Sequence, residues 1–539
     1  MRTGAALLVD ALVAAGVRQL FSLSGNQILS VYDATIGRPL PIYHTRHEAG
    51  AVHMADAWGR LTETPGVALV TAGPGHLNAV SALYGALMSE SPVVLLSGHA
   101  PKGQAGRGAF QEMDQVGAAR PVTKAAWRVE EAARMGEEME RALALATAGR
   151  PGPVHLSLPG DLLDARVPDG VPPPTPPAHT PIVSPVRDAA LARILADLQA
   201  ARRPLIVVGP AMARSARRAA VAALSHATGI PVLPVESPRG LNDPWLHLAA
   251  SVFAQADVVL LLGKRLDYTL RFGDPGVFAP DRRVIQIDWE ASALAGDART
   301  HASMVDDPAR VAARLAELAA GETWKHAAWG DEVRAARDTV PAPWAALRGG
   351  TARPIHPLRV CAALQPFLDR GAILVADGGE FGQWIQAGCE AGTRLINGPS
   401  GSIGSAIPMA LGAKSAHPDR LVIAALGDGT FGFHAFELDT AARHGLPILA
   451  VVGNDARWNA EHQLQLQHYG AERTVGCELA PLRYDQVAAA LGAHGEHVES
   501  PGDLDAALAR AVASGRPAVI NVMIDGVPAP TYRAGAGAH

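Results

Sequence analysis

The sequence predicts an α/β protein with three domains, each built on an open sheet of parallel strands. Short apolar runs alternate with alanine-rich helical patterns along the chain. Because these runs are apolar on both faces, they suit parallel strands buried between two layers of helices. Two proline-rich stretches, 167–185 and 341–357, favour extended, solvated backbone and separate three parts of ordinary domain size. We therefore expect domains at 1–165, 186–340 and 355–535.

Composition and charge exclude several classes of protein. Of the 539 residues, 48% are hydrophobic and 18% charged, which rules out a chain that is disordered throughout. The net charge of −5 argues against a nucleic-acid partner, which would require a basic excess. No segment reaches the roughly 18 continuous apolar residues that span a bilayer, so we expect no membrane partner. Near the start, Leu7, Leu8, Leu12 and Val13 recur at helical spacing, which favours an amphipathic helix over a signal peptide.

The cysteines are few and far apart. They form no CxxC pair, which argues against a disulfide framework and a structural zinc site and fits a reducing cytoplasm. Their positions are Cys361, Cys389 and Cys477.

Ten apolar runs are expected to form the strands. They are VALVTAGPG, PVVLLSG and GPVHLSLP in the first domain, PLIVVG, DVVLLLG and RVIQID in the second, and AILVADGG, LVIAALGDG, PILAVVGND and AVINVMID in the third. In open α/β sheets, ligands bind beyond the carboxyl ends of the strands. The residues that come directly after these runs are therefore the candidate site residues.

The most informative of these residues come after two runs of the third domain. The loop Gly427–Thr430 ends one run, a helical stretch over 433–445 comes next, and Asn454 ends the second run. If the two strands are neighbours, Asp428 and Asn454 lie side by side and offer two oxygen ligands suited to Mg²⁺. The glycines let backbone N–H groups approach a phosphate. A GDG turn by itself is equally compatible with a plain strand-to-helix turn.

The segment GDGTFGFHAFELDTAARHGLPILAVVGND resembles the cofactor-binding motif of thiamine-diphosphate enzymes of the acetolactate synthase and 2-hydroxyacyl-CoA lyase branch. The resemblance implies thiamine diphosphate and Mg²⁺ as cofactors, with the metal bound by Asp428, Asn454 and the carbonyl of Ala456. It also places Gly427, Gly429 and Thr430 at the diphosphate. The family usually has Asn-Asn where this chain has Gly453-Asn454.

In the first domain, IYHTRHEAGAVHMADAWGR resembles the family segment that carries the activating carboxylate, here Glu48. Such a carboxylate hydrogen-bonds N1′ of the aminopyrimidine and favours the imino form that removes the thiazolium C2 proton. The cofactor carries the difficult chemistry. Without the resemblance, Glu48 could equally cap a helix or pair with Arg46 or Arg60.

Four further segments match the family. In LVTAGPGHLNAVSAL the turn borders the aminopyrimidine, and in GRGAFQEMDQVGAARPVTK two residues reach the active site from the partner subunit. NGPSGSIGSAIPMALGA resembles the loop that bends the cofactor into a V shape, with one carbonyl for the 4′-amino group and one apolar wedge, whose alternative role is core packing. GGEFGQW resembles a diphosphate contact. The turn contains Gly73, Pro74 and Asn78, and the two residues that reach across are Phe110 and Gln111. Gly401 would supply the carbonyl and Ile403 the wedge, and Gly382 and Gln383 would contact the diphosphate.

The resemblance covers nearly the whole chain and implies an assembly. The first domain would be pyrimidine-binding, the middle one Rossmann-like and the third diphosphate-binding. In this family the cofactor lies between the first domain of one subunit and the third of another, which implies a homodimer or homotetramer with active sites at the dimer interface. In the middle domain, LLGKRLDYTLRFG leaves two alternatives open: bound FAD or ADP, or a surface ion pair between Arg265 and Asp267.

Three observations bear on the substrate. The short tail after Asp525 would not form the lid that covers CoA in the lyase branch, and no basic cluster serves the CoA phosphates. Gln463 occupies the place of the Trp that selects the second 2-oxo acid in acetolactate synthase. Asn26 and Gln27 are expected near the substrate and suggest a polar one, and Trp458 is expected there as well. Glu461 and His462 either offer a proton donor or form a solvated helix face.

We therefore expect an acetolactate synthase-like enzyme that decarboxylates 2-oxo acids, joins them to a second carbonyl compound, or both. A lyase of the 2-hydroxyacyl-CoA or oxalyl-CoA decarboxylase type is the alternative. A third hypothesis is a non-catalytic subunit that binds thiamine diphosphate, against which the presence of Glu48 argues.

Overall fold

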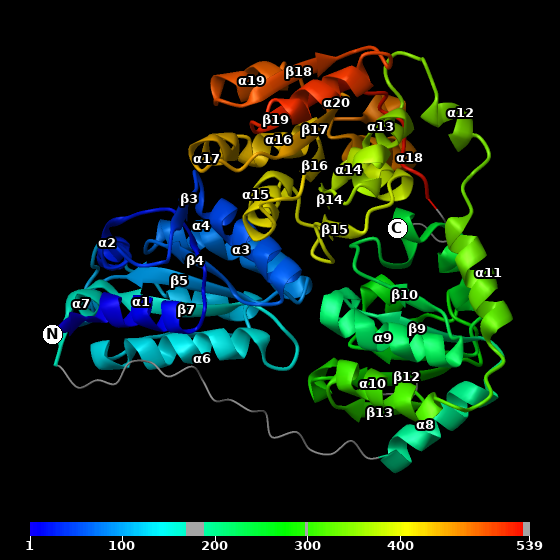
Figure 1. Ribbon diagram of the computed structural model, residues 1–539, viewed down its shortest axis with the longest axis horizontal. Helices are drawn as coiled ribbons and strands as arrows, with labels where there is room; N and C mark the ends of the chain where they lie inside the picture. Colours follow the sequence, from blue (N-terminus) through cyan, green and yellow to red (C-terminus); the bar gives the residue numbers. More distant parts are fainter. Residues whose placement is uncertain (169–187, 297–299, 532–539) are drawn as a thin grey trace. The chain divides into compact units, whose positions relative to one another are not determined.

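Three parallel sheets, each flanked by helices, form most of the described part of the protein (Figure 1), beside a short antiparallel pair of β1 (Arg2–Thr3) and β8 (Arg166–Val167). The structure is a computed structural model, and it describes residues 1–168, 188–296 and 300–531. The predicted α/β class with three parallel-sheet domains is confirmed. By their contacts, the first and third sheets belong to one compact unit and the middle sheet to another.

The N-terminal sheet has six strands in the order β3-β2-β4-β5-β7-β6. Its strands are β2 Leu20–Ser22, β3 Ile42–His44, β4 Gly66–Val70, β5 Val93–His99, β6 Ala125–Arg128 and β7 Val154–Pro159. Helices α1 (Gly4–Ala14) and α6 (Met135–Thr147) pack on one face, and α3 (Glu48–Thr62) and α4 (Pro74–Met88) on the other. The helix predicted near the N-terminus is α1, which buries Leu7, Leu8 and Leu12 against this sheet.

The C-terminal sheet also has six strands, in the order β15-β14-β16-β17-β19-β18. Its strands are β14 Ile373–Ala376, β15 Thr393–Ile396, β16 Val422–Gly427, β17 Leu449–Asn454, β18 His494–Val498 and β19 Ala518–Met523. Its helices are α13 Pro357–Asp369, α14 Gly379–Gly388, α15 Ala406–Ala416, α16 Asp428–His434, α17 Glu437–Arg443, α18 Asn459–Tyr469, α19 Tyr484–Ala490 and α20 Leu504–Ala513.

The N-terminal and C-terminal sheets share one hydrophobic core. Helices α3 and α15 pack against each other, so that a Cβ on Gly412 would collide with the backbone of Met54. Beside this contact, Gln19 Nε2 donates to Ser415 Oγ at 2.8 Å. Such a close approach of two helix backbones is possible because glycine has no side chain.

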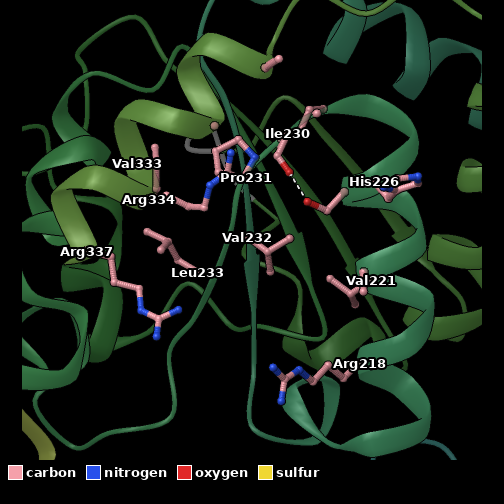
Figure 2. A pocket seen from close by; sticks show the side chains of 15 residues that line it. Arg218, Val221, His226, Ile230, Pro231, Val232, Leu233, Val333, Arg334 and Arg337 are labelled. Carbon is pink, nitrogen blue, oxygen red and sulfur yellow. Dashed lines mark hydrogen bonds between the residues drawn. The ribbon is translucent and has the colours of Figure 1, made fainter. Parts of the chain in front are cut away.

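The central sheet has five strands in the order β10-β9-β11-β12-β13. They are β9 Pro204–Val208, β10 Val232–Pro234, β11 Val258–Leu262, β12 Arg283–Asp288 and β13 Ala302–Val305, and the main helices are α8 Asp188–Ala200, α9 Ser215–Thr228, α10 Pro308–Ala319 and α11 Ala327–Asp338. A cavity of about 540 Å³ opens beside edge strand β10, between α9 and α11 (Figure 2). It is lined by apolar side chains such as Val221 and Val333 and by Arg218, Arg334 and Arg337.

All ten predicted runs form strands, and the unpredicted strands of the three parallel sheets lie at their edges, except for β2, an interior strand of only three residues. Edge strands β3 and β6 are only partly buried, so they carry no run that is apolar on both faces. The predicted helical stretch over 433–445 is divided between α16 and α17, and the second proline-rich stretch contains a short helix, α12 (Trp344–Arg348). Of the first proline-rich stretch, only residues 167 and 168 lie within the described residues. Among the described helices, none has the length and apolar character needed to cross a membrane.

Candidate active site

Glu48 is the first residue of α3, directly beyond the carboxyl end of β3. Its neighbour His47 caps the helix, because His47 Nδ1 accepts from the backbone N–H of Ala49 at 3.1 Å. The Glu48 carboxylate is 8% exposed, and its Oε2 accepts from Asn78 Nδ2 at 3.0 Å. Two residues predicted at the cofactor are therefore in direct contact, and Oε1 remains for another partner.

The turn before α4 fits tightly against this carboxylate. A Cβ on Gly75 would lie 2.7 Å from Thr71 Cγ2 and 3.1 Å from Glu48 Oε1. Thr71 Oγ1 in turn donates to Gln27 Oε1 at 2.6 Å. Only a residue without a side chain leaves the space in front of Glu48 open.

Gly73 adopts a left-handed conformation at φ 58° and is fixed by a residue that the sequence analysis did not identify. Its N–H donates to Gln115 Oε1 at 2.9 Å, and Gln115 Nε2 donates to the carbonyl of Gly98 at 2.9 Å. Gln115 is 1% exposed, and its Nε2 also donates to Ser157 Oγ at 3.2 Å. Gln111, at φ 59°, packs its backbone on Gly73.

The remaining predicted residues of this domain are more exposed. Phe110 is 69% exposed, and Asn26 is exposed as well. Gln27 is partly buried and bound to Thr71, so it differs from Asn26 in having a fixed side chain. Their role at a substrate stays a prediction.

Asp428 and Asn454 lie at the ends of neighbouring strands. β16 pairs with β17 in parallel, with Gly427 opposite Gly453, so the expected adjacency is confirmed. Asp428 is 2% exposed, and its Oδ2 has no hydrogen-bond partner among the described residues. Burial and the charge of Asp455 raise the pKa of Asp428 to about 7, and burial raises that of Asp455 to about 6.

The amide of Asn454 is held in one orientation. Its Nδ2 donates to Asn521 Oδ1 at 3.1 Å and to the carbonyl of Leu482 at 3.0 Å. Its Oδ1 accepts from the N–H of Ala456 at 3.2 Å and keeps a second lone pair. Ala456 adopts φ 57°, and its carbonyl already accepts from Leu479 N–H at 2.7 Å, which leaves one lone pair there too.

Aromatic rings surround this loop. The ring of Trp458 lies on Gly429, where a Cβ would approach it to 2.7 Å, and meets Phe433 edge-on at 6.3 Å between centroids. The ring of Phe381 lies 2.5 Å from the position of a Cβ on Gly453. The departure from the family's Asn-Asn is therefore explained by Phe381, which fills the space that an asparagine would need.

Asp377 organises the loop that carries Gly401 and Ile403, and the sequence analysis did not identify it. It is fully buried after β14 and accepts from the N–H groups of Gly378, Gly404 and Ala406 at 2.8, 2.9 and 3.0 Å. Burial raises its pKa to about 6. A carboxyl directly after a predicted strand, in AILVADGG, was the available signal.

Ile403, the predicted wedge, lies on this loop, and the residues predicted at the diphosphate lie on α14 and at the junction of β16 and α16. Gly401 adopts φ 69°, and Ile403 Cγ2 approaches the Cβ position of Gly378 to 2.7 Å. Gln383 is buried and donates to Glu380 at 3.3 Å. Two predicted residues close their own turn, because Thr430 Oγ1 donates to the carbonyl of Gly427 at 3.0 Å.

Helix α18 begins at Asn459, just after the loop that carries Asn454 and Ala456. Glu461 is exposed, whereas His462 is partly buried and its Nδ1 has no hydrogen-bond partner in the described part of the chain. Gln463 Nε2 donates to Asn459 Oδ1 and to the carbonyl of Gly526, both at 3.0 Å. Gln463 thus ties the helix to the segment after β19.

The predicted residues form two groups, one on each sheet of the same unit. Within the described chain, no hydrogen bond joins Glu48 itself to Asp428, although Glu437, shortly after α16, accepts from the N–H groups of Arg46 and His47. The donor chemistry fits the implied cofactors: Asp428 offers a buried oxygen without a partner and Asn454 an oriented amide oxygen, both suited to Mg²⁺. The space kept open by Gly75 faces the free oxygen of Glu48.

Comparison with known proteins gives a match over all three domains. The matching families are described as thiamine pyrophosphate enzyme, N-terminal TPP binding domain (residues 2–118), central domain (191–315) and C-terminal TPP binding domain (377–522). The chain belongs to the thiamine pyrophosphate enzyme family. The resemblance stated from the sequence is therefore confirmed.

Relatives of this thiamine pyrophosphate enzyme carry two kinds of name. An acetolactate synthase large subunit of Mycobacterium tuberculosis is 35% identical over 96% of this chain and 95% of its own length. A 2-hydroxyacyl-CoA lyase of Oryza sativa subsp. japonica is 30% identical over 97% and 95%. A human 2-hydroxyacyl-CoA lyase 2 is 31% identical over 92% and 85%.

The central domain of this thiamine pyrophosphate enzyme separates the two alternatives for its GKRLD segment only in part. Asp267 pairs with buried Lys264 at 3.0 Å, and Arg265 lies 3.9 Å from Glu290. Arg265 and Asp267 thus have different partners, so the alternative of an ion pair between them is not found among the described residues. Bound FAD or ADP stays a prediction. The cavity of Figure 2 is lined by none of the predicted residues.

Proposed function

We propose that the protein is a thiamine-diphosphate- and Mg²⁺-dependent enzyme that acts on 2-oxo acids, by decarboxylation, by carboligation or by both, as an acetolactate synthase-like enzyme does. The observation that carries the proposal is the pair Asp428 and Asn454, an unpartnered buried carboxylate oxygen beside an oriented amide oxygen. When bound, thiamine diphosphate supplies an electron sink that lets a bond to a carbonyl carbon break or form.

Glu48 would hold a proton at N1′ of the aminopyrimidine. Asn78 occupies its Oε2, so Oε1 is the atom available for that hydrogen bond. The carboxylate is buried, and a buried carboxylate with few donors is an effective acceptor. Gly75 and the Gly73–Pro74 turn keep the access open, and Gln115 holds that turn in place.

Asp428, Asn454 and the carbonyl of Ala456 would hold Mg²⁺ against the diphosphate. A bound cation would stabilise the ionised form of Asp428, whose pKa burial otherwise raises to about 7. Gly427, Gly429 and Thr430 lie on the same loop and would offer backbone N–H groups to phosphate oxygens. Asp377 would keep Gly401 and Ile403 at a fixed position beside them.

In the reaction, a 2-oxo acid would lose CO₂. Its acyl carbon would then gain a proton to give an aldehyde, or bond to the carbonyl carbon of a second 2-oxo acid. His462, whose Nδ1 lies buried without a partner among the described residues, and Glu461 are the candidate proton donors. Gln463, where the synthase has Trp, would leave a more polar surface toward the second substrate.

The test combines purified protein, thiamine diphosphate, Mg²⁺ and ¹³C-labelled pyruvate, with products followed by NMR. Acetolactate supports the synthase reaction and acetaldehyde a decarboxylase. Bulkier and polar 2-oxo acids are tested in the same way. If the cofactor binds but no 2-oxo acid is turned over, the proposal is wrong. The Glu48→Gln variant serves as the blank.

A lyase that cleaves 2-hydroxyacyl-CoA compounds is the second candidate. Its support is the identity of 30–31% to proteins of that name over more than nine-tenths of this chain. Calorimetry with CoA and a cleavage assay with a 2-hydroxyacyl-CoA separate the two candidates. Measurable cleavage together with inactivity on 2-oxo acids would favour the lyase.

We also propose that the active enzyme is a homodimer or homotetramer, with Glu48 of one subunit facing Asp428 of the other. The support is that Glu48 and Asp428 lie beyond strands of different sheets and share no hydrogen bond with each other in one described chain. Mixing an inactive Glu48→Gln variant with an inactive Asp428→Asn variant tests this. Random exchange makes about half of the dimers mixed, each with one intact site of two, so about a quarter of the activity should return, and none if each chain is self-sufficient.

A further inference from the structure

We infer that Glu437 is a positioning residue for Glu48. It lies on α17 of the C-terminal domain, shortly after α16, yet its carboxylate binds the backbone directly before Glu48. This inference rests on the proposed function, in which Glu48 activates the cofactor. It assigns to Glu437 the task of aiming that carboxylate.

The contacts of Glu437 are specific and fully buried. The residue is 1% exposed. Its Oε1 accepts from the N–H groups of Arg46 and His47, both at 3.1 Å, and its Oε2 from Arg46 at 3.2 Å. Thr440 Oγ1 donates to Oε2 at 2.6 Å. Several hydrogen bonds thus converge on one carboxylate, and two of the donor residues immediately precede Glu48.

The burial of this carboxylate is unfavourable by itself. Burial raises the pKa of Glu437, because the charged form loses its hydration. A buried carboxylate is tolerated where hydrogen bonds replace that hydration, and here backbone N–H groups do so. The negative charge also lies at the N-terminal end of α3, where the helix dipole favours it. The unfavourable burial of the Glu437 carboxylate is therefore offset at a position where it holds the peptide N–H groups of Arg46 and His47.

The first turn of α3 is fitted around this group. A Cβ on Gly50 would lie 2.5 Å from Glu437 Oε1, so a side chain there would displace the carboxylate. His47, whose N–H is held by Glu437, is also the residue that caps α3 through its ring. The direction in which Glu48 leaves the helix start therefore depends on where Glu437 holds the backbone.

An alternative role for Glu437 is to anchor the two domains to each other. Helices α3 and α15 already do this through the shared apolar core. The two roles predict different results. An anchor acts on stability and assembly, whereas a positioning residue acts on the rate at which Glu48 works once the cofactor is bound.

The test compares Glu437→Gln with Asp439→Asn as the matched control. Asp439 lies on the same helix and contacts the same segment, but through the Arg46 side chain at 3.5 Å. With thiamine diphosphate and Mg²⁺ added to the full-length protein, quenched-flow NMR measures the exchange of the cofactor C2 proton, and calorimetry measures cofactor affinity. This exchange requires no identified substrate.

We expect Glu437→Gln to slow C2 exchange roughly 10- to 100-fold while cofactor affinity changes less than about 3-fold, since small misplacements of a catalytic group cost this much. Asp439→Asn should leave both values unchanged. Exchange at the wild-type rate in Glu437→Gln, whatever its melting temperature, would overturn the inference. If that variant does not fold, Thr440→Val, which removes one donor only, should slow exchange about 2- to 5-fold, and an unchanged rate there would overturn it. Absence of exchange in the wild-type protein would instead refute the proposed function.

Discussion

The N-terminal and C-terminal sheets have the same topology. Numbered by their order within each domain, the strands of both sheets run second, first, third, fourth, sixth, fifth. In both, the helix that comes after the second strand, α3 or α15, packs against its counterpart in the other domain. The first and third domains are thus related in fold, which the sequence did not show.

The two sheets differ in the residues that lie beyond equivalent strands. After the third strand, the N-terminal domain has the turn at Gly73, whereas the C-terminal domain has Asp428. After the second strand, the first has Glu48 and the second the loop that Asp377 holds. The N-terminal acid is paired with an amide, and one oxygen of the C-terminal acid has no partner among the described residues. One frame thus supports one sheet whose acid is hydrogen-bonded and one sheet whose acid keeps an oxygen for the proposed metal.

The largest effect is expected in the N-terminal domain, at Glu48 beyond the carboxyl end of β3. Glu48→Gln keeps the shape but removes the charge, and we expect C2 exchange of bound thiamine diphosphate to fall about 10²- to 10⁴-fold, the usual range for a general acid–base group. Cofactor affinity should change little. Glu137→Gln, at an exposed position of α6, is the control. An unchanged exchange rate would show that Glu48 has no catalytic role.

In the C-terminal domain, Asp428→Asn should weaken Mg²⁺ and cofactor binding instead of slowing C2 exchange in the bound cofactor. Replacing the carboxylate removes the negative ligand, so we expect the Mg²⁺ dependence of cofactor binding to weaken about 100-fold or more. Titration of Mg²⁺ at fixed thiamine diphosphate, followed by tryptophan fluorescence, measures this. If Glu48→Gln weakened Mg²⁺ binding as much as Asp428→Asn, the assignment of activation to Glu48 and of metal binding to Asp428 would be wrong.

Gly453→Asn tests the departure from the family pattern beside the proposed metal site. The Phe381 ring occupies the space, so we expect the free energy of unfolding to fall by about 1–3 kcal/mol through overpacking. Adding Phe381→Ala should recover part of that loss, and a double-mutant cycle in urea measures the coupling. Additive effects would contradict the steric explanation.

Acidic residues of the two domains should also make opposite contributions to the pH dependence of the free energy of unfolding in the cofactor-free protein. Asp428 titrates near pH 7 when folded and near 3.8 when unfolded, so unfolding releases a proton between these values, and the free energy of unfolding falls as pH rises through this window, by roughly 1–3 kcal/mol. In the N-terminal domain, burial would raise the pKa of Asp56, but Arg60 outweighs it and lowers the pKa, so that its contribution is lost as pH falls below about 4. Urea unfolding from about pH 2 to pH 8 checks both.

Asp428→Asn should flatten the decline above pH 4 and make the cofactor-free protein more stable at pH 8. Arg60→Gln should remove the loss at acid pH. An unchanged slope in Asp428→Asn would mean that other groups, such as Asp377 or Asp455, carry the dependence.

The parts of the fold that were predictable rest on local patterns. Buried central strands are apolar on both faces, and Asp428 and Asn454 each lie at the end of such a strand, so their adjacency could be inferred. Edge strand β3 has no such pattern, because it is partly exposed. Gln115 and Glu437 were missed for another reason: their partners lie 42 and 390 positions away, and no local pattern encodes such a contact.

The close approach of Met54 and Gly412 has a consequence for biosynthesis. More than half of the chain separates the two positions. At a synthesis rate of roughly 5–20 residues per second, the face of α3 that ends up in the shared core waits some 20–70 s for α15 to leave the ribosome. During that interval the nascent N-terminal domain exposes an apolar surface, which chaperones would bind until the C-terminal domain has been synthesised.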